Sequence, residues 1–167
     1  GVVLHTADGG LSWKKQLDGT ALAQVMLQDA RALPGEVSER AVREAEQLVS
    51  DGPDKPLLDL LIQKDGAVLV VGAFGLALRS TDGGATWRDW HDHIPNAKGA
   101  HLYAVRRIGD AIFLVGEQGT VLRSTDEGQS FSALTVPYNG SFFGVVEVGQ
   151  GGVLAYGLRG NAFLSTD

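Results

Sequence analysis

The chain contains no cysteine among its 167 residues, which excludes a disulfide framework, a thiolate zinc site and a cysteine nucleophile. No apolar run reaches the ~18 residues of a membrane-spanning helix. Gly1 opens directly into a strand-like segment, so we expect neither a membrane span nor a signal peptide in this stretch. Lysine and arginine are outnumbered by acids, and the net charge is −6. Nucleic-acid-binding domains usually carry a basic stripe, so we expect no nucleic-acid partner.

Glycine is the residue in excess. The chain has 23 glycines, about twice the usual share of ~7%. Apolar residues make up 44% of the chain, which is too much for a disordered tail. We therefore expect one ordinary folded domain over residues 1–167.

A motif centred on aspartate recurs along the chain. The copies are residues 1–13, 75–87, 119–131 and, cut off at the last residue, 160–167. Their aspartates, Asp8, Asp82, Asp126 and Asp167, are 74, 44 and 41 residues apart. A unit of ~40–45 residues is the length of one four-stranded propeller blade. The first interval is longer by roughly 31 residues, which predicts an insertion within it.

Each unit predicts four strands, which we call A to D from the inside of the blade outward. The A strands are expected at 57–62, 102–108 and 142–148, and the B strands at 67–72, 111–116 and 152–157. A glycine opens each C strand, and the D strands follow the aspartate motif near 87–90 and 131–134. The chain should supply a C–D pair, two whole blades and an A–B–C blade, roughly 13 strands in all. The predicted fold class is all-β, a partial β-propeller of about three blades.

The motif Ser/Thr-x-Asp-x-Gly-x-Ser/Thr-Trp/Phe resembles the Asp-box (BNR) repeat of sialidases and other propellers. The lead-in Val-Gly-x-x-Gly-x-x-Leu-Arg-Ser-Thr-Asp and the segment 51–59 are similar to the photosystem II stability/assembly factor family and its bacterial relatives. This resemblance implies a scaffold for protein binding or complex assembly, without a cofactor, in an extracytoplasmic (periplasmic or secreted) location. Family members are usually longer, so the resemblance also predicts that this chain is a fragment.

Each Asp box places a carboxylate where a strand ends and a tight turn begins. Such a carboxylate can accept two or three turn N–H groups, while glycine supplies a positive φ and a serine hydroxyl ties the turn back. The alternatives are a calcium loop or a catalytic acid, but calcium needs several oxygen ligands and each motif offers one acid. We therefore expect a structural role, with the aromatic residue packed between blades. The residues concerned are Asp8, Gly10, Trp13, Ser80, Asp82, Gly84, Trp87, Ser124, Asp126, Gly128 and Phe131.

The inserted residues 20–50 change period and predict a helical hairpin. The first helix should end at Pro34, and Ser38 should cap a second helix that ends at Gly52. We expect the hairpin to pack beside the loops 91–101 and 135–141, either as a structural cap or as a docking surface for a partner.

Blade topology divides the turns between two faces. The D–A and B–C connections share one face, which we call the near face, and the Asp boxes lie on the opposite, far face. Ligands usually meet variable loops on a rigid scaffold, so the near face is the candidate binding face. Its candidate residues are Phe74, His91, His93, His101, Glu117, Tyr138, Asn139 and Arg159.

Catalytic signatures are weak. His91, His93 and His101 could approach one another as metal ligands, but polar loop histidines are the more common case, and we expect no metal. A glycosidase could recruit Glu117 and Asp92, yet no Glu–Tyr pair or arginine cluster of the sialidase kind is present. The pair Arg106–Arg107 should meet nearby acids, the alternative being an acidic partner segment. No nucleophile elbow, phosphate loop or dinucleotide fingerprint occurs, so no catalytic residue is predicted.

The function that these patterns favour is a non-enzymatic propeller that binds a protein partner. The alternative is a sialidase-like glycoside hydrolase or a carbohydrate-binding propeller. Open strand edges would be prone to aggregation, so we expect a second chain, as in a homo-oligomer, or further blades to complete the ring.

Overall fold

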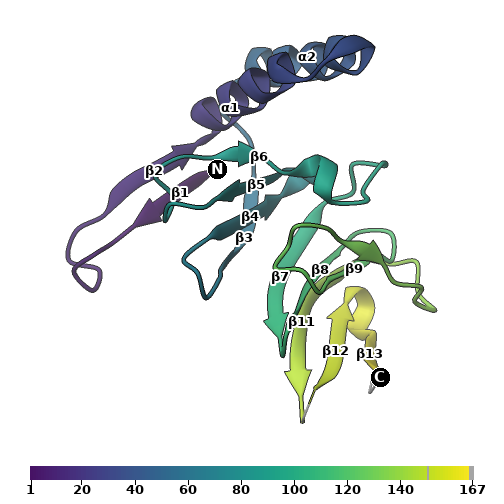
Figure 1. Ribbon diagram of the computed structural model, residues 1–167. Helices are drawn as coiled ribbons and strands as arrows, with labels where there is room; N and C mark the ends of the chain where they lie inside the picture. The colour runs from purple at the N-terminus through teal and green to yellow at the C-terminus, as the bar shows by residue number, and fades with distance from the viewer. Residues whose placement is uncertain (150, 166–167) are drawn as a thin grey trace.

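The computed structural model describes residues 1–149 and 151–165, so the fourth Asp-box aspartate, Asp167, lies outside the described residues. Thirteen strands form four antiparallel sheets within that part of the chain. The first pair consists of β1 (Val2–His5) and β2 (Lys14–Asp18). Blade 1 contains β3 (Leu57–Ile62), β4 (Val68–Gly72), β5 (Ala77–Ser80) and β6 (Arg88–Asp89). Blade 2 contains β7 (Leu102–Ile108), β8 (Ala111–Gly116), β9 (Val121–Ser124) and β10 (Ser132–Ala133). Blade 3 contains β11 (Phe142–Val148), β12 (Gly152–Gly157) and β13 (Ala162–Ser165). The predicted partial propeller is confirmed, with an outer pair, two four-stranded blades and a three-stranded blade (Figure 1).

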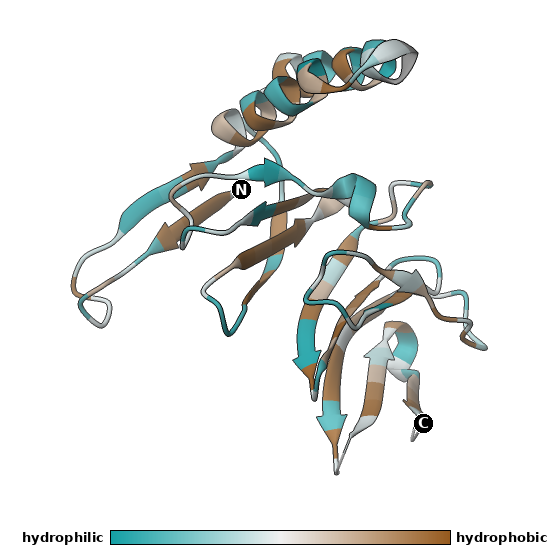
Figure 2. Ribbon diagram, viewed as in Figure 1, coloured by the Kyte–Doolittle hydropathy of each residue, from teal (hydrophilic) through white to brown (hydrophobic). Residues whose placement is uncertain are grey.

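Apolar layers between neighbouring sheets hold the blades together. Every residue of β4 and β8 is buried, because both faces of these strands are covered. Leu69 and Val71 of blade 1 meet Val105 and Leu114 of blade 2 in one cluster. A second cluster joins blades 2 and 3, and a third joins the first pair, α1 and blade 1. Figure 2 shows the hydrophobic stretches concentrated along the blade strands.

The insertion forms two helices, α1 (Gly19–Ala32) and α2 (Gly35–Ser50). Asp18, the last residue of β2, caps α1 by accepting the Ala21 N–H at 2.9 Å. The sequence predicted Ser38 as the cap of α2, but the cap position is occupied by Pro34. Gly35 has a φ of +72°, which lets the chain reverse directly after Pro34, so α2 begins before Ser38. The Ser38 hydroxyl instead donates to the Ala30 carbonyl at 3.2 Å and joins the two helices.

The hairpin was expected to pack beside the loop 135–141, but it lies elsewhere. In Figure 1 it lies at the end of the molecule opposite β11–β13. Helix α1 packs on the outer strands β2 and β6, where the Asp29 carboxylate accepts bonds from the Arg88 side chain at 2.7 Å and the Asp89 N–H at 2.8 Å. The reason is that α1 continues directly from an outermost strand. Its apolar side chains, including Leu22, therefore pack into the cluster that joins the first pair and blade 1 rather than onto the near face.

Hydrogen bonds define the near face. The B–C connection of each blade, which we call its tip, donates to the segment that leads into the A strand of the same blade. These bonds run from Ala73 N–H to the Pro56 carbonyl at 3.0 Å, from Glu117 to His101 at 3.0 Å and from Leu158 to Ser141 at 2.9 Å. Tips and D–A connections therefore share one face, as the topology predicted.

Blade 1, beyond the reach of the first pair, and blade 3 both present apolar side chains to solvent. Leu60 of β3 occupies the register position of Val105 and Val145, which pack against the preceding blade, yet Leu60 is 41% exposed. No inner strands of the first pair cover it within the described residues. Val146 is also 41% exposed on blade 3, and Leu164 is 57% exposed. The structure thus has two uncovered apolar flanks.

Candidate functional site

The three described Asp boxes have the same hydrogen-bond geometry on the far face. In blade 1 the Ser80 hydroxyl donates to Asp82 at 2.8 Å and accepts the Gly84 N–H at 2.8 Å. The Thr86 N–H and hydroxyl both donate to the Asp82 carboxylate, at 2.8 and 2.6 Å. The same pattern surrounds Asp8 and Asp126.

Each of these carboxylates accepts two hydroxyl groups and the N–H of Ser12, Thr86 or Ser130. The N–H of the preceding residue, Leu11, Ala85 or Gln129, adds a weaker bond, so two turn N–H groups reach each carboxylate, within the predicted two or three. Hydrogen bonds from Ser12, Thr86 and Ser130 are the main reason why the pKa values of Asp8, Asp82 and Asp126 are lowered to about 2. The carboxylates are thus ionised anchors of their turns. Among the described residues, no group of three or more His, Cys, Asp or Glu residues is placed to hold a metal ion.

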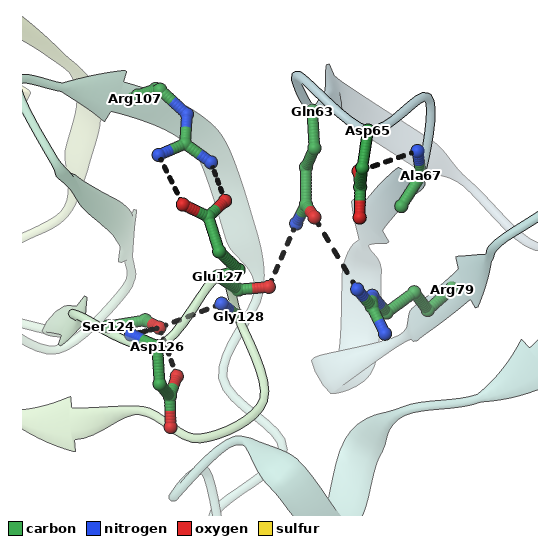
Figure 3. Close-up of polar contacts among 9 residues, drawn as sticks. All are labelled: Gln63, Asp65, Ala67, Arg79, Arg107, Ser124, Asp126, Glu127 and Gly128. Atoms are coloured by element: carbon green, nitrogen blue, oxygen red, sulfur yellow. Dashed lines mark hydrogen bonds and ion pairs between the residues drawn. The ribbon is translucent and has the colours of Figure 1, made fainter.

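The Asp box of blade 2 also ties two blades together (Figure 3). Glu127 adopts a φ of +58° at the position where the other boxes have glycine, Gly9 and Gly83. Its carboxylate pairs with Arg107 on β7, and its carbonyl accepts a bond from the Gln63 side chain of blade 1 at 3.2 Å.

The neighbouring Arg106 also meets an acid, Asp59 of blade 1. Both arginines of the pair therefore meet acids, as the sequence favoured. Arg106 and Asp59 form a second link between blades 1 and 2.

The three histidines of the candidate binding face do not come together. His91 lies between the carboxylates of Asp89 and Asp92, at 2.7 and 2.9 Å, and its hydrogen bond to Asp89 is the main cause that raises its pKa. His93 stacks on Trp90 with a ring separation of 3.7 Å, and its Nδ1 lies 2.7 Å from the carbonyl of Gln129.

The positions of His91 and His93 differ from the expected grouping because β6 ends after two residues. The chain then turns back towards the Asp box of blade 2, where the Trp90 side chain bonds the Gly128 carbonyl. Of the three, only His101 lies beside a tip, where its carbonyl accepts the Glu117 N–H.

The tips repeat an unusual backbone conformation. Their central residues, Phe74, Gln118 and Arg159, have φ values of +57°, +55° and +61°. Positive φ is uncommon for residues other than glycine, and such strain is concentrated at functional sites. All three side chains are exposed, and Phe74 is 69% exposed. The tips therefore present different side chains from one backbone geometry.

A row of four rings crosses the near face from blade 1 to blade 3. The ring centroids of Phe74 and His101 are 4.7 Å apart, those of His101 and Tyr103 are 6.1 Å apart, and those of Tyr103 and Phe143 are 5.3 Å apart. Each contact is edge-to-face, with interplanar angles of 76°, 72° and 76°. We call these four residues the ring row.

Sequence reasoning missed Tyr103 and Phe143. Each lies at a register shift near the start of an A strand, between Leu102 and Ala104 on β7 and at the equivalent place on β11. Leu58 takes the same position on β3. A bulge re-aims the side chain that it carries, which explains why these residues leave the strand alternation. The signal available in the sequence was a large apolar or aromatic residue at the second position of every A strand.

Glu117 bonds to two members of the ring row. Its carboxylate accepts the His101 N–H at 2.9 Å and the Tyr103 hydroxyl at 3.3 Å. Burial, followed by the Glu117 charge, raises the pKa of Tyr103, so this phenol stays protonated as a donor.

The remaining candidates are Tyr138, Asn139 and Arg159. The Tyr138 ring packs near Phe142 and Phe163, and its hydroxyl donates to the Leu158 carbonyl at 3.0 Å, so it supports the tip of blade 3. Asn139 and Arg159 are exposed.

The near face also has a groove of about 260 Å³. It lies between the loop 95–100 and the tip of blade 2, including Gln118. A larger groove of about 420 Å³ lies between α1 and the end of the Asp-box turn of blade 1.

In the part of the chain that the structure describes, neither helix has the length and apolar character to cross a membrane.

Four-stranded blades with an Asp box between the two outer strands define an Asp-box β-propeller. The family model described as Photosynthesis system II assembly factor YCF48 matches residues 38–151, about two thirds of the chain. The chain belongs to this family.

Two solved structures show the same fold. YCF48 from Cyanidioschyzon merolae has 25% sequence identity and a TM-score of 0.54, over 67% of this chain and 34% of that protein. A structure described as YCF48 bound to D1 peptide has 24% identity and a TM-score of 0.58, over 68% of this chain and 37% of that one. The chain therefore matches only about a third of the length of these relatives. No curated protein matches significantly.

Proposed function

We propose that this chain is part of a non-enzymatic propeller that binds a segment of a protein partner on its near face and serves complex assembly. Membership of the assembly-factor family supports the proposal, and one similar structure is described as bound to D1 peptide. The observation that carries it is the ring row, because exposed aromatic side chains on a rigid scaffold are typical of protein-binding surfaces.

The glycoside hydrolase and carbohydrate-binding alternative is not favoured. A glycosidase needs two carboxylates about 5–10 Å apart on either side of the sugar. The two candidate carboxylates have separate partners: Glu117 bonds to His101 and Tyr103, whereas Asp92 pairs with His91. Within residues 1–149 and 151–165, they share no bonding partner that would place them on either side of one sugar.

Peptide binding tests the proposal. Labelled D1 peptide and peptides selected from a random display library are titrated with the chain, and fluorescence anisotropy gives the Kd. We expect Phe74→Ala and Phe143→Ala to weaken binding, because each removes an exposed ring of the row. Leu11→Ala is the matched control, since Leu11 is 89% exposed but lies in a far-face Asp box. Absence of binding by both kinds of peptide to the folded chain would contradict the proposal.

We further propose that a second copy of the chain covers the uncovered flanks and completes the propeller. The exposure of Leu60, Ile62, Val146 and Leu164 supports this, since large apolar patches mark association surfaces. Light scattering over a range of concentrations tests it. Dimers or larger rings that dissociate on Ile62→Lys are expected, and a stable monomer throughout would contradict homo-oligomer formation.

An extracytoplasmic location also remains a proposal, supported by the family resemblance. Fractionation of source cells with an antibody to the chain tests it. Recovery in the periplasmic or secreted fraction is expected, and recovery in the cytoplasmic fraction would contradict it.

A further inference from the structure

Glu117 is a half-buried carboxylate that lacks a permanent cation. Its side chain is 31% exposed, and its ion-pair partner is His101 at 3.9 Å, which is charged only when protonated. No lysine or arginine pairs with Glu117 among the described residues. By contrast, Asp59 and Glu127 each meet an arginine. A carboxylate partly removed from water is stabilised by a cation, so Glu117 is a position where a partner can supply one.

The carboxylate also has unused acceptor capacity. It has about four lone-pair positions, and two of them are used by the His101 N–H and the Tyr103 hydroxyl. These two bonds hold the side chain in one orientation, which reduces the entropy that a ligand must remove. Both oxygens can therefore accept further donors from one planar group, as arginine presents them.

The rings on either side favour the same kind of ligand. A cation is attracted to a ring face within about 6 Å of its centroid. Centroid separations along the row are 4.7 to 6.1 Å, so a cation placed against the row comes within reach of two neighbouring rings. Phe74 and Phe143 are 69% and 46% exposed, which keeps both ends of the row open.

The conformation of Phe74 points to a ligand as well. A bulky residue at a φ of +57° is disfavoured relative to glycine, and exposure of its ring to water is disfavoured too. Contact with a bound side chain would offset the cost of exposure. The equivalent tips carry Gln118 and Arg159, so the backbone itself does not require an aromatic residue.

We propose that the ring row and Glu117 bind an arginine side chain of the partner segment, with the guanidinium on the carboxylate and its plane against the rings. Lysine fits less well, because it cannot form two parallel hydrogen bonds or stack. This inference rests on the proposed function and specifies the chemistry of its partner.

The experiment uses peptides selected on the chain from a random display library. Each selected peptide is synthesised with its basic residue intact and with arginine replaced by citrulline, a neutral side chain of similar shape. We expect arginine to be enriched in the selected peptides and citrulline to weaken binding by about tenfold or more. Glu117→Gln should weaken the arginine peptide to a similar degree and leave the citrulline peptide almost unchanged.

Glu147→Gln is the matched control, because it removes the same charge from an exposed position on β11 outside the ring row. Thermal unfolding of both variants shows whether they are folded. Selected peptides that bind without a basic residue, or equal affinity for the arginine and citrulline forms, would overturn the inference while the proposed function stands. Failure to select any binding peptide, together with absence of binding by the D1 peptide, would instead contradict the proposed function.

Discussion

The far-face and near-face turns of this propeller are repeated in opposite ways. In the Asp boxes the side chains themselves repeat, and the hydroxyl bonds to Asp8, Asp82 and Asp126 from the residue two positions earlier measure 2.8, 2.8 and 2.7 Å. At the tips the backbone repeats, but the central side chains are those of phenylalanine, glutamine and arginine. Repetition of side chains identifies the turns that build the scaffold. Repetition of the backbone under different side chains identifies the turns that are free to recognise a partner.

The largest expected effect concerns the aromatic residue of the Asp box. Trp87 is 7% exposed between the first pair and blade 1, whereas Trp13 of the first pair is 60% exposed. Trp87→Ala should lower the free energy of unfolding by about 3–5 kcal/mol, and Trp13→Ala by less than about 0.5 kcal/mol. Urea unfolding measures both. Equal losses would show that the far-face motif stabilises its turn without neighbouring blades.

A pair of substitutions tests the division between the faces directly. Phe74→Gly should weaken peptide binding, while the free energy of unfolding stays the same or rises by up to about 1 kcal/mol as the strain at positive φ is removed. Asp126→Asn should lower the unfolding midpoint and leave peptide affinity unchanged, since it weakens the bonds to Ser124 and Ser130. Anisotropy and thermal unfolding are recorded on the same samples. Binding lost in Asp126→Asn at unchanged stability would break the comparison.

Acid should destabilise the far face first. The pKa values of the box aspartates are about 2 in the folded chain against 3.8 for the ordinary group, so the unfolded chain takes up protons first as the pH falls. Their stabilisation is complete above pH ~4 and is lost as the pH falls to about 2. Asp82→Asn should make this decline shallower. An identical slope in the variant would mean that other groups control acid unfolding.

The smallest effect is expected where blade 2 departs from the box pattern. Glu127→Gly removes strain at a φ of +58° but also the ion pair with Arg107, so the net change should stay within about 1 kcal/mol. Gly83→Glu makes the reverse change in blade 1, where Ile62 takes the register position of Arg107. It should destabilise by about 1–2 kcal/mol, because no arginine compensates. A neutral result for Gly83→Glu would show that these turns carry no strain.

Strand positions could be predicted from the sequence because most of the A to C strands are rich in apolar residues and end at glycine or other turn residues. The A strands 57–62, 102–108 and 142–148 have the predicted bounds. The hairpin was also predicted as an element, but its position was not. Position depends on the packing of α1 against β6, which rests on contacts between residues far apart in the sequence, such as Asp29 with Arg88.

Only part of the candidate site could be predicted from the sequence. The tips follow from topology, so Phe74, His101 and Glu117 were found. Tyr103 and Phe143 depend on bulges, where one added residue reverses the side-chain alternation that sequence reasoning follows.

Helix α1 has a consequence for the order in which the molecule opens. It continues from β2, and Asp29 bonds Arg88 and the Asp89 N–H at β6, so it fastens the first pair to blade 1. A two-stranded sheet is marginally stable by itself. Amides of β1 and β2 should therefore exchange with solvent hydrogen together with those of the hairpin, as one cooperative unit. Opening of this edge must separate the apolar cluster around Leu22 and Trp87 as well as the Asp29 contacts, and it would leave blades 2 and 3 closed.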